Sequence, residues 1–592
     1  MPDFNNPQQD PGMERRLLLV FALTFLVIIL FQPLLKKYLP QTSTPATPAT
    51  PVAAQPSAQP AAAAPAPAAA AQVPVPAAGV TKQAAAEAET VIENDLYRVT
   101  FTNRGGLVKS WILKKYNDDQ GKPLELVSKA AAQYGYPMSL WTYDEVQLNK
   151  INSALYVVTY DHGATAAKVG PEVIHAPAEI TFEYADGDVA VRKTLSFDHT
   201  YVVHTETSVV SKGSQVTAFP MWPAGFGDQA SASSYAGSSI EHQYNDKTER
   251  LAIKKVSGGA TLQGPFNWAA VVDQYFAAVF LPDDIQNAAM VTLRHQVEIP
   301  KDARNPKPNE TIKEDVLGVG VGNLHGSTVE RVYVGPKSLG VLESVSVPTL
   351  TGAPPDLRAL INFGFFGIIA RPLFLWLKWT YGWMHNWGWA IVVQTLIINV
   401  ALLPLRISSM KSALKMQKVA PQIKAIQEKY KKYSMRDPRK QEMNQEVSAL
   451  YKAEGVNPVG GCLPMVIQMP FLFAYYSMLG AALDLRQAHW LWIHDLSSPD
   501  PWHLLPIGII ITMLLTQRMT PQPGMDPSQQ KMMTFMMPLM LGVISWNLAA
   551  GLCLYWSEGN LVAIVQQAVM NRTSLGREMR EIALKRARKK EK

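Results

Sequence analysis

The stretch TLIINVALLPLR, residues 395–406, decides how the chain folds, because polar residues interrupt a run that is otherwise apolar enough to cross a membrane. These polar residues are Thr395, Asn399 and Arg406. On one continuous helix, at about 100° per residue, the three side chains fall within roughly 40° of one another. We therefore expect a single polar stripe along an apolar helix, with Arg406 at one end.

Five charge-free runs of 14 to 29 residues occur along the chain. A bilayer-spanning helix needs about 20 apolar residues. WNLAAG, residues 546–551, interrupts the last run, which we interpret as two helices joined by a tight turn. The 14-residue run is counted as a span, although this length also suits a buried or re-entrant helix. The sequence thus predicts six spans. The charge-free runs are residues 17–35, 387–405, 455–483, 504–517 and 532–557.

Basic residues are concentrated in two segments between or after these runs. Residues 406–453 contain 12 Lys or Arg against 4 Asp or Glu, and residues 572–592 contain 9 against 3. The positive-inside rule places both segments in the cytoplasm. With six spans, both termini are then expected in the cytoplasm. The run 17–35 is expected to remain as an anchor; a cleaved signal peptide is the alternative, but no small-residue cleavage pattern follows it closely.

The first half of the chain contains three regions that differ in amino-acid composition. Residues 1–37 are expected to form an N-terminal tail and the first transmembrane helix, and residues 38–87 an Ala- and Pro-rich linker. Residues 88–345 contain short alternating segments with turn signals such as Asp186-Gly187, which predict antiparallel strands. We expect this region to be a β-sandwich outside the membrane.

The second half is expected to be helical. Residues 355–385 are crowded with Phe, Trp and Tyr, which favours an interfacial amphipathic helix; a seventh span is the alternative. Residues 386–572 are expected to form a core of five spanning helices. Within it, residues 407–453 have near-helical apolar spacing on both sides of a polar break, which predicts a cytoplasmic helical hairpin. Residues 573–592 are expected to form a basic cytoplasmic tail.

Ionisable and polar side chains inside a membrane are expensive and therefore mark candidate functional positions. Glu558 is the one acidic residue well inside any predicted span. The alternative for Glu558 is a carboxylate that snorkels or is hydrogen-bonded near the outer interface, and Arg406 can equally be a basic anchor at a helix end. Asn399 can equally be an interhelical hydrogen-bonding group.

No motif in the chain indicates an enzyme. Nucleotide-binding, zinc-binding and nucleophile-elbow patterns are missing from the sequence, and its two cysteines, Cys462 and Cys553, both lie in apolar runs. We therefore expect no cofactor, no metal and no catalytic residue. Methionines cluster in KMMTFMMPLM, residues 531–540, and flexible thioethers suit a surface that receives varied apolar partners, although ordinary packing also explains them.

Several long blocks resemble, in the same order, those of the YidC family of membrane protein insertases. The blocks are NWGWAIVVQTLIINVALLPL, ALYKAEGVNPVGGCLPMVIQMPFLFAYYSML, LRQAHWLWIHDLSSPDPWHLLPI, DPSQQKMMTFMMPLM and GLCLYWSEGNLVAIVQQ. The likeness is strong over about residues 355–572. The layout of the first half is similar to that of Gram-negative members. It implies a polytopic α-helical membrane protein of six spans, with a five-helix insertase core and a periplasmic all-β domain resembling a galactose-mutarotase-like supersandwich.

The resemblance implies a chaperone that inserts newly made proteins into the bacterial inner membrane, alone or with the Sec translocon, without a nucleotide. A substrate's polar segment would enter a hydrophilic groove, and its apolar helix would leave along a slide on the third and fifth spans. Further partners would be anionic lipids and, through the basic hairpin and tail, the ribosome. The groove residues would be Thr395, Asn399, Arg406, Gln468, Tyr475, Tyr555, Trp556 and Glu558, and the slide residues Met465, Met469, Leu472, Met533, Met536 and Met537.

The chain departs from the family pattern in the groove. Asn399 stands where the family usually has an arginine, Trp556 replaces a tyrosine, and Glu558 replaces a residue that is usually apolar. Our hypothesis is that the groove stays polar while its charge is rearranged, with Arg406 positive near the cytoplasm and Glu558 negative deeper in the membrane. The alternatives to an insertase are a secondary transporter, although no repeated halves are evident, and an envelope enzyme with its site in the β region.

Overall fold

The computed structural model describes residues 81–160, 164–165, 172–229, 231–245, 247–301, 310–347, 356–433, 437–456, 463–519 and 532–591. The predicted first span, at residues 17–35, and most of the predicted linker lie outside these residues. The chain separates into two compact units, and residues 415–458 belong to the smaller one. The larger unit contains both the β region and the other helices of the second half.

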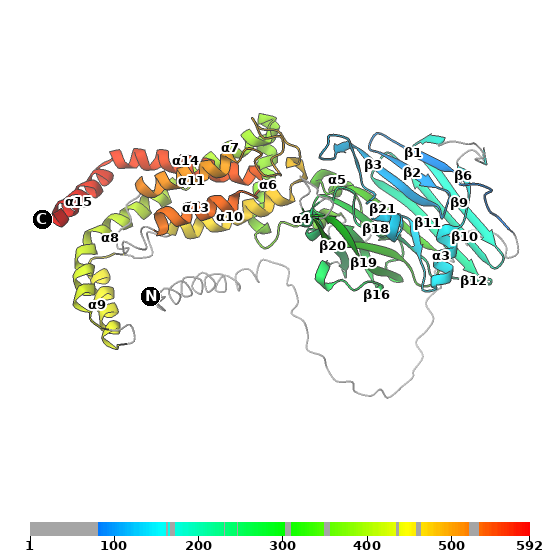
Figure 1. Ribbon diagram of the computed structural model, residues 1–592, viewed down its shortest axis with the longest axis horizontal. Helices are drawn as coiled ribbons and strands as arrows, with labels where there is room; N and C mark the ends of the chain where they lie inside the picture. Colours follow the sequence, from blue (N-terminus) through cyan, green and yellow to red (C-terminus); the bar gives the residue numbers. More distant parts are fainter. Residues whose placement is uncertain are drawn as a thin grey trace, which may run out of the picture. The chain divides into compact units, whose positions relative to one another are not determined.

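The β region is built from three sheets (Figure 1). The first has the order β4-β3-β2-β1-β8, in which β1 and β8 are parallel and the other pairs antiparallel. Its strands are β1 (Glu89–Glu93), β2 (Tyr97–Thr102), β3 (Leu107–Asn117), β4 (Pro123–Glu125) and β8 (Glu172–His175).

The largest sheet has eleven strands in the order β15-β14-β17-β18-β21-β11-β10-β9-β6-β7, with β12 paired to β11. Alternating burial along VAVRKTLSF, residues 189–197, places one face of β10 in the core. The predicted turn joins β9 to β10, and Gly187 there has φ 59°. The strands are β6 (Val157–Tyr160), β7 (Ala164–Thr165), β9 (Ala178–Asp186), β10 (Val189–Phe197), β11 (Val202–Ser211), β12 (Ser214–Gln215), β14 (Ser239–Tyr244), β15 (Lys247–Ala252), β17 (Phe266–Val272), β18 (Phe276–Pro282) and β21 (Thr328–Pro336).

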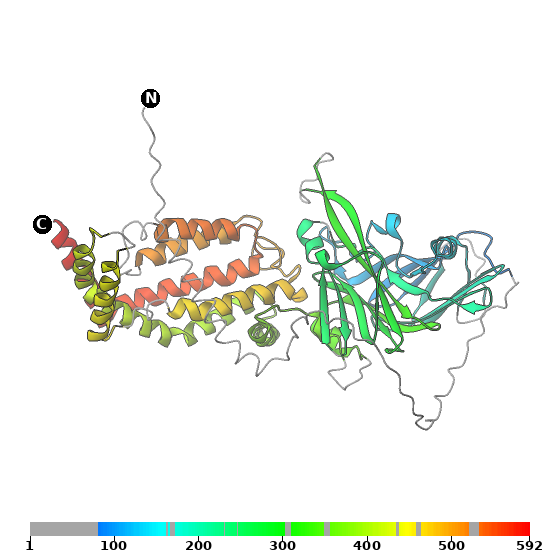
Figure 2. The ribbon, with the colours of Figure 1, turned by 90° about the horizontal axis from the view of Figure 1, so that it is seen from below.

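The third sheet has the order β16-β19-β20-β13-β5, and its two long strands form a hairpin (Figure 2). Short helices connect the strands of the β region: α2 (Ala131–Tyr134), α3 (Glu145–Ser153), α4 (Ala232–Ala236) and α5 (Leu339–Ser344). The strands are β5 (Ser139–Trp141), β13 (Phe219–Trp222), β16 (Ala260–Gln263), β19 (Ala288–Pro300) and β20 (Thr311–Asn323).

Lys193 is one of several charged residues that are buried inside this β region. Lys193 of β10 is only 1% exposed. Its Nζ donates to the carbonyl oxygens of Gly105 at 2.7 Å and Met138 at 2.8 Å, and more weakly to that of Gly106 at 3.4 Å. The buried ammonium thus replaces water with three backbone acceptors, as buried charges require.

The second half of the chain is helical. α14 packs against α7 and α11, α13 packs against α11, and α6 packs against α7 and α10. α6 runs across the direction of the other helices and is seen end on in Figure 2. The helices are α6 (Gly367–Met384), α7 (Trp387–Ala401), α8 (Leu403–Lys429), α9 (Arg439–Ala453), α10 (Leu463–Ala481), α11 (Leu504–Met519), a π-helical turn (Met532–Met536) that continues into α13 (Met537–Ser545), α14 (Ala550–Arg572) and α15 (Ser574–Glu591).

The expected single helix through residues 395–406 is wrong. α7 ends at Ala401, α8 begins at Leu403, and the two axes differ by 48°. Pro404 explains the break, because proline has no N–H to donate to the carbonyl four residues earlier and its ring clashes with that carbonyl. Arg406 therefore lies on a different helix from Thr395 and Asn399. The predicted break at residues 546–551 is present as the gap between α13 and α14.

The segment 482–503 covers one end of the helices α7 and α14. The N–H groups of Ala550 and Gly551 donate to the carbonyls of Ser498 and Leu496 at 2.7 and 2.8 Å. The side chain of Asn386, which also caps α7, donates to the carbonyl of His489 at 3.0 Å. These bonds satisfy backbone groups that a helix end leaves unpaired.

The described part of the smaller unit is a pair of helical arms. Val419 and Ile423 of α8 pack with Val456, which follows α9. Lys429 and Glu446 form an ion pair at 2.7 Å between the two arms. α8 continues through residue 407, so the first arm is the extension of a longer helix and does not begin at the predicted boundary.

The basic tail is helical and has a packed face. Met579 of α15 is buried with Met410 and Leu414 of α8, and Leu575 and Ile582 lie at the edge of the same cluster. The sequence interpretation missed this contact, although residues 575, 579 and 582 have helical spacing. The many charged residues of this segment obscure its apolar spacing in the sequence.

Within the described residues, no single helix is both long and apolar enough to cross a membrane. Together α7 and α8 meet that length and composition as a bent pair, while α11 and residues Thr534–Ser545 are shorter apolar helices. The six spans stay a prediction.

Candidate functional site

Polar side chains from three helices meet inside the helical bundle. Gln394, Thr395 and Asn399 of α7 are 4% exposed or less, and Tyr475 of α10 is fully buried. α14 contributes two residues on adjacent turns, since Tyr555 and Glu558 are three positions apart. We call the set of six residues the polar seam: Gln394, Thr395, Asn399, Tyr475, Tyr555 and Glu558.

Two tyrosines form the centre of the polar seam. The rings of Tyr475 and Tyr555 are stacked, with centroids 3.9 Å apart and planes 12° from parallel. The Tyr475 hydroxyl donates to Gln394 Oε1, and Gln394 Nε2 donates to the carbonyl of Leu373 on α6 at 3.0 Å. One chain of contacts thereby links α14, α10, α7 and α6. This arrangement fixes the ring positions, because buried polar groups keep the partners that satisfy them.

The other two α7 residues of the polar seam bond to their own helix. Thr395 Oγ1 donates to the carbonyl of Ile391 at 2.7 Å, and Asn399 Nδ2 donates to the carbonyl of Thr395 at 2.9 Å. Gln566 Nε2 of α14 donates to the main-chain carbonyl of Asn399 at 3.1 Å. The contact between α7 and α14 at this level thus uses the Asn399 backbone, while its amide donor is engaged within α7.

Glu558 differs from the other residues of the polar seam. It lies eight residues into α14, about 12 Å along the helix. Its side chain is half-buried, and its Oε2 is enclosed without a hydrogen-bond partner among the residues that the structure describes. The carboxylate is close enough to Tyr475 to interact with it electrostatically. It is therefore the unsatisfied polar group of the seam.

The remaining predicted groove residues are more dispersed. Gln468 and Trp556 are half-buried, and Trp556 packs at the edge of the bundle core. Gln468 precedes Tyr475 by seven residues on α10, about 10 Å along the helix. Arg406 is half-buried on α8, beyond the bend. Gln394 is the site residue that the prediction left out. Its contact with Tyr475 joins positions 81 apart in sequence.

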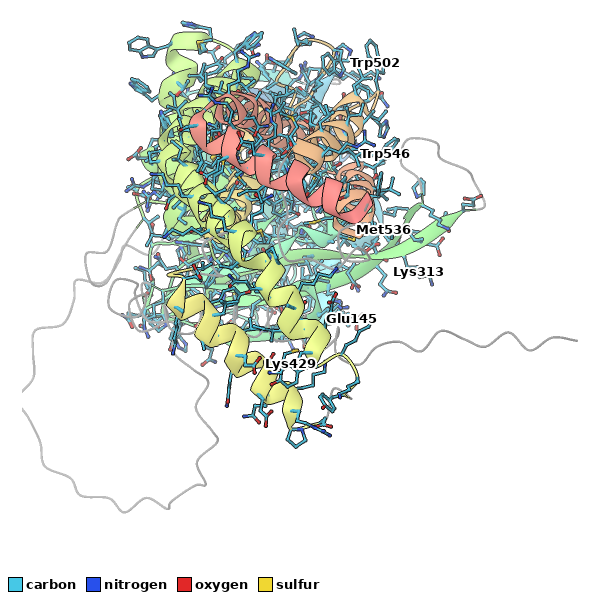
Figure 3. The ribbon with its side chains drawn as sticks, turned by 90° about the vertical axis from the view of Figure 1, so that its left-hand side faces the viewer. Glu145, Lys313, Lys429, Trp502, Met536 and Trp546 are labelled. Atoms are coloured by element: carbon cyan, nitrogen blue, oxygen red, sulfur yellow. The ribbon has the colours of Figure 1, made fainter. Side chains whose placement is uncertain are left out.

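The predicted slide residues lie on two helical segments. Met469 and Met536 are exposed, and Leu472 and Met537 are half-buried; the side chains of Met465 and Met533 lie outside the described part of the chain. Figure 3 shows Met536 on the outside of the bundle. α10 and α13 overlap in Figure 1 but are separated in Figure 2, so the segments are not packed side by side.

Large apolar side chains are exposed along the bundle at helical spacing. α11 exposes Ile507, Ile511 and Leu515, and α14 exposes Leu561, Val565 and Val569. Soluble proteins rarely expose continuous apolar surfaces of this kind, which mark contact with a membrane or a partner. α13 adds a further set: Leu539, Met540, Val543 and Ile544.

Two family models match the chain. The model described as 60Kd inner membrane protein matches residues 379–577, and the model described as YidC periplasmic domain matches residues 89–376. The chain is 31% identical over 517 residues to a membrane protein insertase YidC of Cupriavidus necator, covering 83% of this chain and 84% of that protein. It is 30% identical over 581 residues to the Syntrophus aciditrophicus protein of the same name, covering 95% and 100%.

Among solved structures, the crystal structure of an active YidC insertase with the first transmembrane domain resolved is similar to this chain. The match has a TM-score of 0.32 and a sequence identity of 19%, and it covers 83% of this chain and 94% of that structure.

Proposed function

The chain belongs to the YidC family of membrane protein insertases, and from this premise we propose that the polar seam receives the polar segment of a substrate during insertion. The chain is accordingly an inner-membrane insertase with a periplasmic β domain and is not an enzyme. Its substrates are newly made membrane proteins. The observation that carries the proposal is Glu558 Oε2, which is enclosed without a hydrogen-bond partner among the described residues, beside two stacked tyrosines inside an apolar bundle.

The physical basis of this proposal is desolvation. A short hydrophilic segment that enters hydrocarbon loses its hydrogen bonds to water, at roughly 2 to 7 kcal/mol for each polar group left without a partner. Side chains of the polar seam provide replacement partners within the bundle. Thr395 and Asn399 extend the polar surface by one further turn of α7. No nucleotide is needed, because the substrate's apolar helix gains free energy when it enters the lipid.

We further propose that this helix leaves between α10 and α13, along Met469, Leu472, Met536 and Met537. Exposure of Met469 and Met536 supports the proposal, since thioether side chains adapt to apolar partners of different shape. Arg406, Gln468 and Trp556 would line the route of the polar segment. Met465 and Met533, whose side chains lie outside the described part of the chain, are the other two residues of the proposed slide.

The topology that we propose has six spans, both termini in the cytoplasm, and a periplasmic domain of the supersandwich type. The α6 helix would lie in the membrane interface, because it exposes Leu375, Trp379 and Trp383 on one face and buries Leu373 and Leu377 on the other. We propose the Sec translocon and anionic lipids as partners. The basic hairpin and tail would contact lipid headgroups or the ribosome through phosphate charge.

Ribosome binding by the tail can be separated from folding. Deletion of residues 584–592 removes six Lys or Arg but keeps Met579 and Ile582, which pack against α8. We expect the shortened protein to remain folded and to co-sediment with ribosomes less than the full chain at low salt, with the difference vanishing at high salt. Equal co-sedimentation at every salt concentration would exclude the tail as a ribosome contact.

Site-specific photocrosslinking to a stalled nascent membrane protein tests the route. We expect crosslinks to the polar segment from Thr395 and crosslinks to the apolar helix from Met469 and Met536. Two exposed control positions, Ile511 on α11 and Glu145 in the β domain, should give few crosslinks. A pattern in which Ile511 crosslinks while the other bundle positions do not would disprove the proposed route.

A further inference from the structure

We propose that Glu558 makes the polar seam selective for charge, so that transferred segments carrying Lys or Arg are inserted more readily than segments carrying Asp or Glu. This inference rests on the proposed function, because it assigns a substrate class to the same site. It goes beyond that function in giving one side chain a specificity role that the other seam residues do not share.

The first argument is that the hydrogen-bond donors around Glu558 are already engaged. The Tyr475 hydroxyl donates to Gln394, Asn399 Nδ2 donates within α7, and Thr395 Oγ1 also donates within α7. The neighbouring Asn560 on α14 donates to Thr512 of α11 at 3.3 Å. Each of these groups thus has a partner of its own, whereas Glu558 Oε2 has no donor among the described residues. An incoming substrate group can supply that donor.

The second argument concerns charge. The polar seam contains Gln, Thr, Asn and Tyr besides Glu558, so its other members are neutral. Lys378 of α6 forms an ion pair with Asp484 at 3.6 Å. Arg572, at the end of α14, lies fourteen residues from Glu558, about 21 Å along the helix. None of the ion pairs found among the described residues includes Glu558. A carboxylate without a counter-ion attracts a cation and repels an anion.

The third argument is the position of the carboxylate. Its half-buried side chain lies on the same side of α14 as the exposed Leu561, Val565 and Val569, which follow it by three, seven and eleven residues, so it can be reached along that exposed stripe. Two unit charges about 4 Å apart change an equilibrium by roughly fivefold even at the dielectric constant of water, and by more in a less polar site. A measurable preference is therefore expected from one group.

The test uses the full-length protein in liposomes of neutral lipid without a transmembrane potential, because a potential by itself biases charged tails. The substrate is one single-span protein whose short transferred tail carries two Lys, two Gln or two Asp at the same positions. We expect the wild-type protein to insert the Lys tail at least about fivefold faster than the Asp tail, with the Gln tail between them.

The variant Glu558→Gln keeps the size of the side chain and should bring the Lys-to-Asp ratio close to one, with little change for the Gln tail. The matched control Glu581→Gln removes one carboxylate from the exposed surface of α15 and should leave the ratio unchanged. The variant Asn399→Asp places a second carboxylate in the polar seam and should raise the ratio, which provides a test if Glu558→Gln folds poorly.

The outcomes separate the two proposals. Insertion of the Gln tail at equal rates with and without the protein would contradict the proposed function. Protein-dependent insertion of the Gln tail, with a Lys-to-Asp ratio that is the same for wild type, Glu558→Gln and Asn399→Asp, would overturn the charge selectivity alone.

Discussion

Lys193 in the β domain and Glu558 in the helical bundle are both ionisable groups inside a fold, but their surroundings are opposite. Lys193 donates to the carbonyls of Gly105, Met138 and Gly106, whereas Glu558 Oε2 has no partner among the described residues. Burial lowers the pKa of the Lys193 ammonium to about 7, and the three carbonyls hold the group in place. The β domain thus uses a buried polar group to fix its own backbone.

In the helical bundle, the half-buried Glu558 carboxyl group has a different role from that of Lys193. A carboxylate left without a partner lowers stability, because its desolvation is not compensated. Such a group is retained where it serves a ligand, as perturbed groups in functional sites generally do. In this pair, the group with partners belongs to the structure of the β domain, and the group whose Oε2 has none among the described residues belongs to the proposed site.

The largest expected effect belongs to Lys193→Met. The variant keeps the length of the side chain but leaves the carbonyls of Gly105 and Met138 without their donor, which costs about 2 to 4 kcal/mol of unfolding free energy at pH 7. Thermal unfolding of the full-length protein in detergent would measure this loss, while insertion at permissive temperature should be unaffected. A variant as stable as the wild type would show that the three hydrogen bonds contribute nothing net.

Glu330 is a buried carboxyl group of the β domain whose surroundings differ from those of Lys193. Its side chain is 1% exposed, and neither carboxylate oxygen has a partner among the described residues. Burial, followed by the charge of Asp283, raises the pKa of Glu330 well above its usual value near 4.3. A raised carboxyl pKa stabilises the fold below the unfolded pKa and loses that contribution as the pH rises through the folded pKa.

We therefore expect Glu330→Gln to stabilise the protein by about 1 to 2 kcal/mol at pH 7.5 and by almost nothing at pH 4, since an amide needs no proton to stay neutral. Unfolding midpoints at the two pH values provide the measurement. A variant destabilised at pH 7.5 would show that Glu330 has a stabilising partner.

The smallest expected effect is that of Asn399→Ala. The Asn399 amide donates within its own helix, and its carbonyl, which accepts from Gln566, survives the substitution. We expect a change below about 1 kcal/mol in unfolding free energy and a smaller loss of insertion than for Glu558→Leu. Loss of insertion with Asn399→Ala alone, while Glu558→Leu and Arg406→Ala were silent, would end the hypothesis of rearranged charge.

Much of the architecture could be predicted from local patterns. Alternation along residues 189–197 and the Asp186-Gly187 turn predicted the β9-β10 hairpin, and WNLAAG predicted the break between α13 and α14. The polar stripe failed because Pro404 ends a helix that hydrophobicity alone would continue. Because Pro404 is visible in the sequence, the end of this helix could have been predicted from it.

The site was harder to predict because its contacts join distant positions. Polarity inside apolar runs identified Thr395, Tyr475 and Glu558 one by one, but the sequence does not show that Gln394 meets Tyr475 or that Tyr475 stacks on Tyr555. The packed face of α15 was hidden by its charge, because Met579 and Ile582 are separated by arginine and glutamate. These are properties of tertiary packing, which local periodicity does not contain.

The most direct test of the central claim is to measure the unfolding midpoint and the insertion rate of a substrate with a Lys-containing tail for the same Glu558→Leu protein. The account predicts a midpoint equal to or above that of the wild type, because an uncompensated carboxylate is removed, together with an insertion rate reduced by about fivefold or more. A midpoint that falls as far as that of Lys193→Met, with insertion unchanged at permissive temperature, would show that Glu558 is a structural group and would contradict the account.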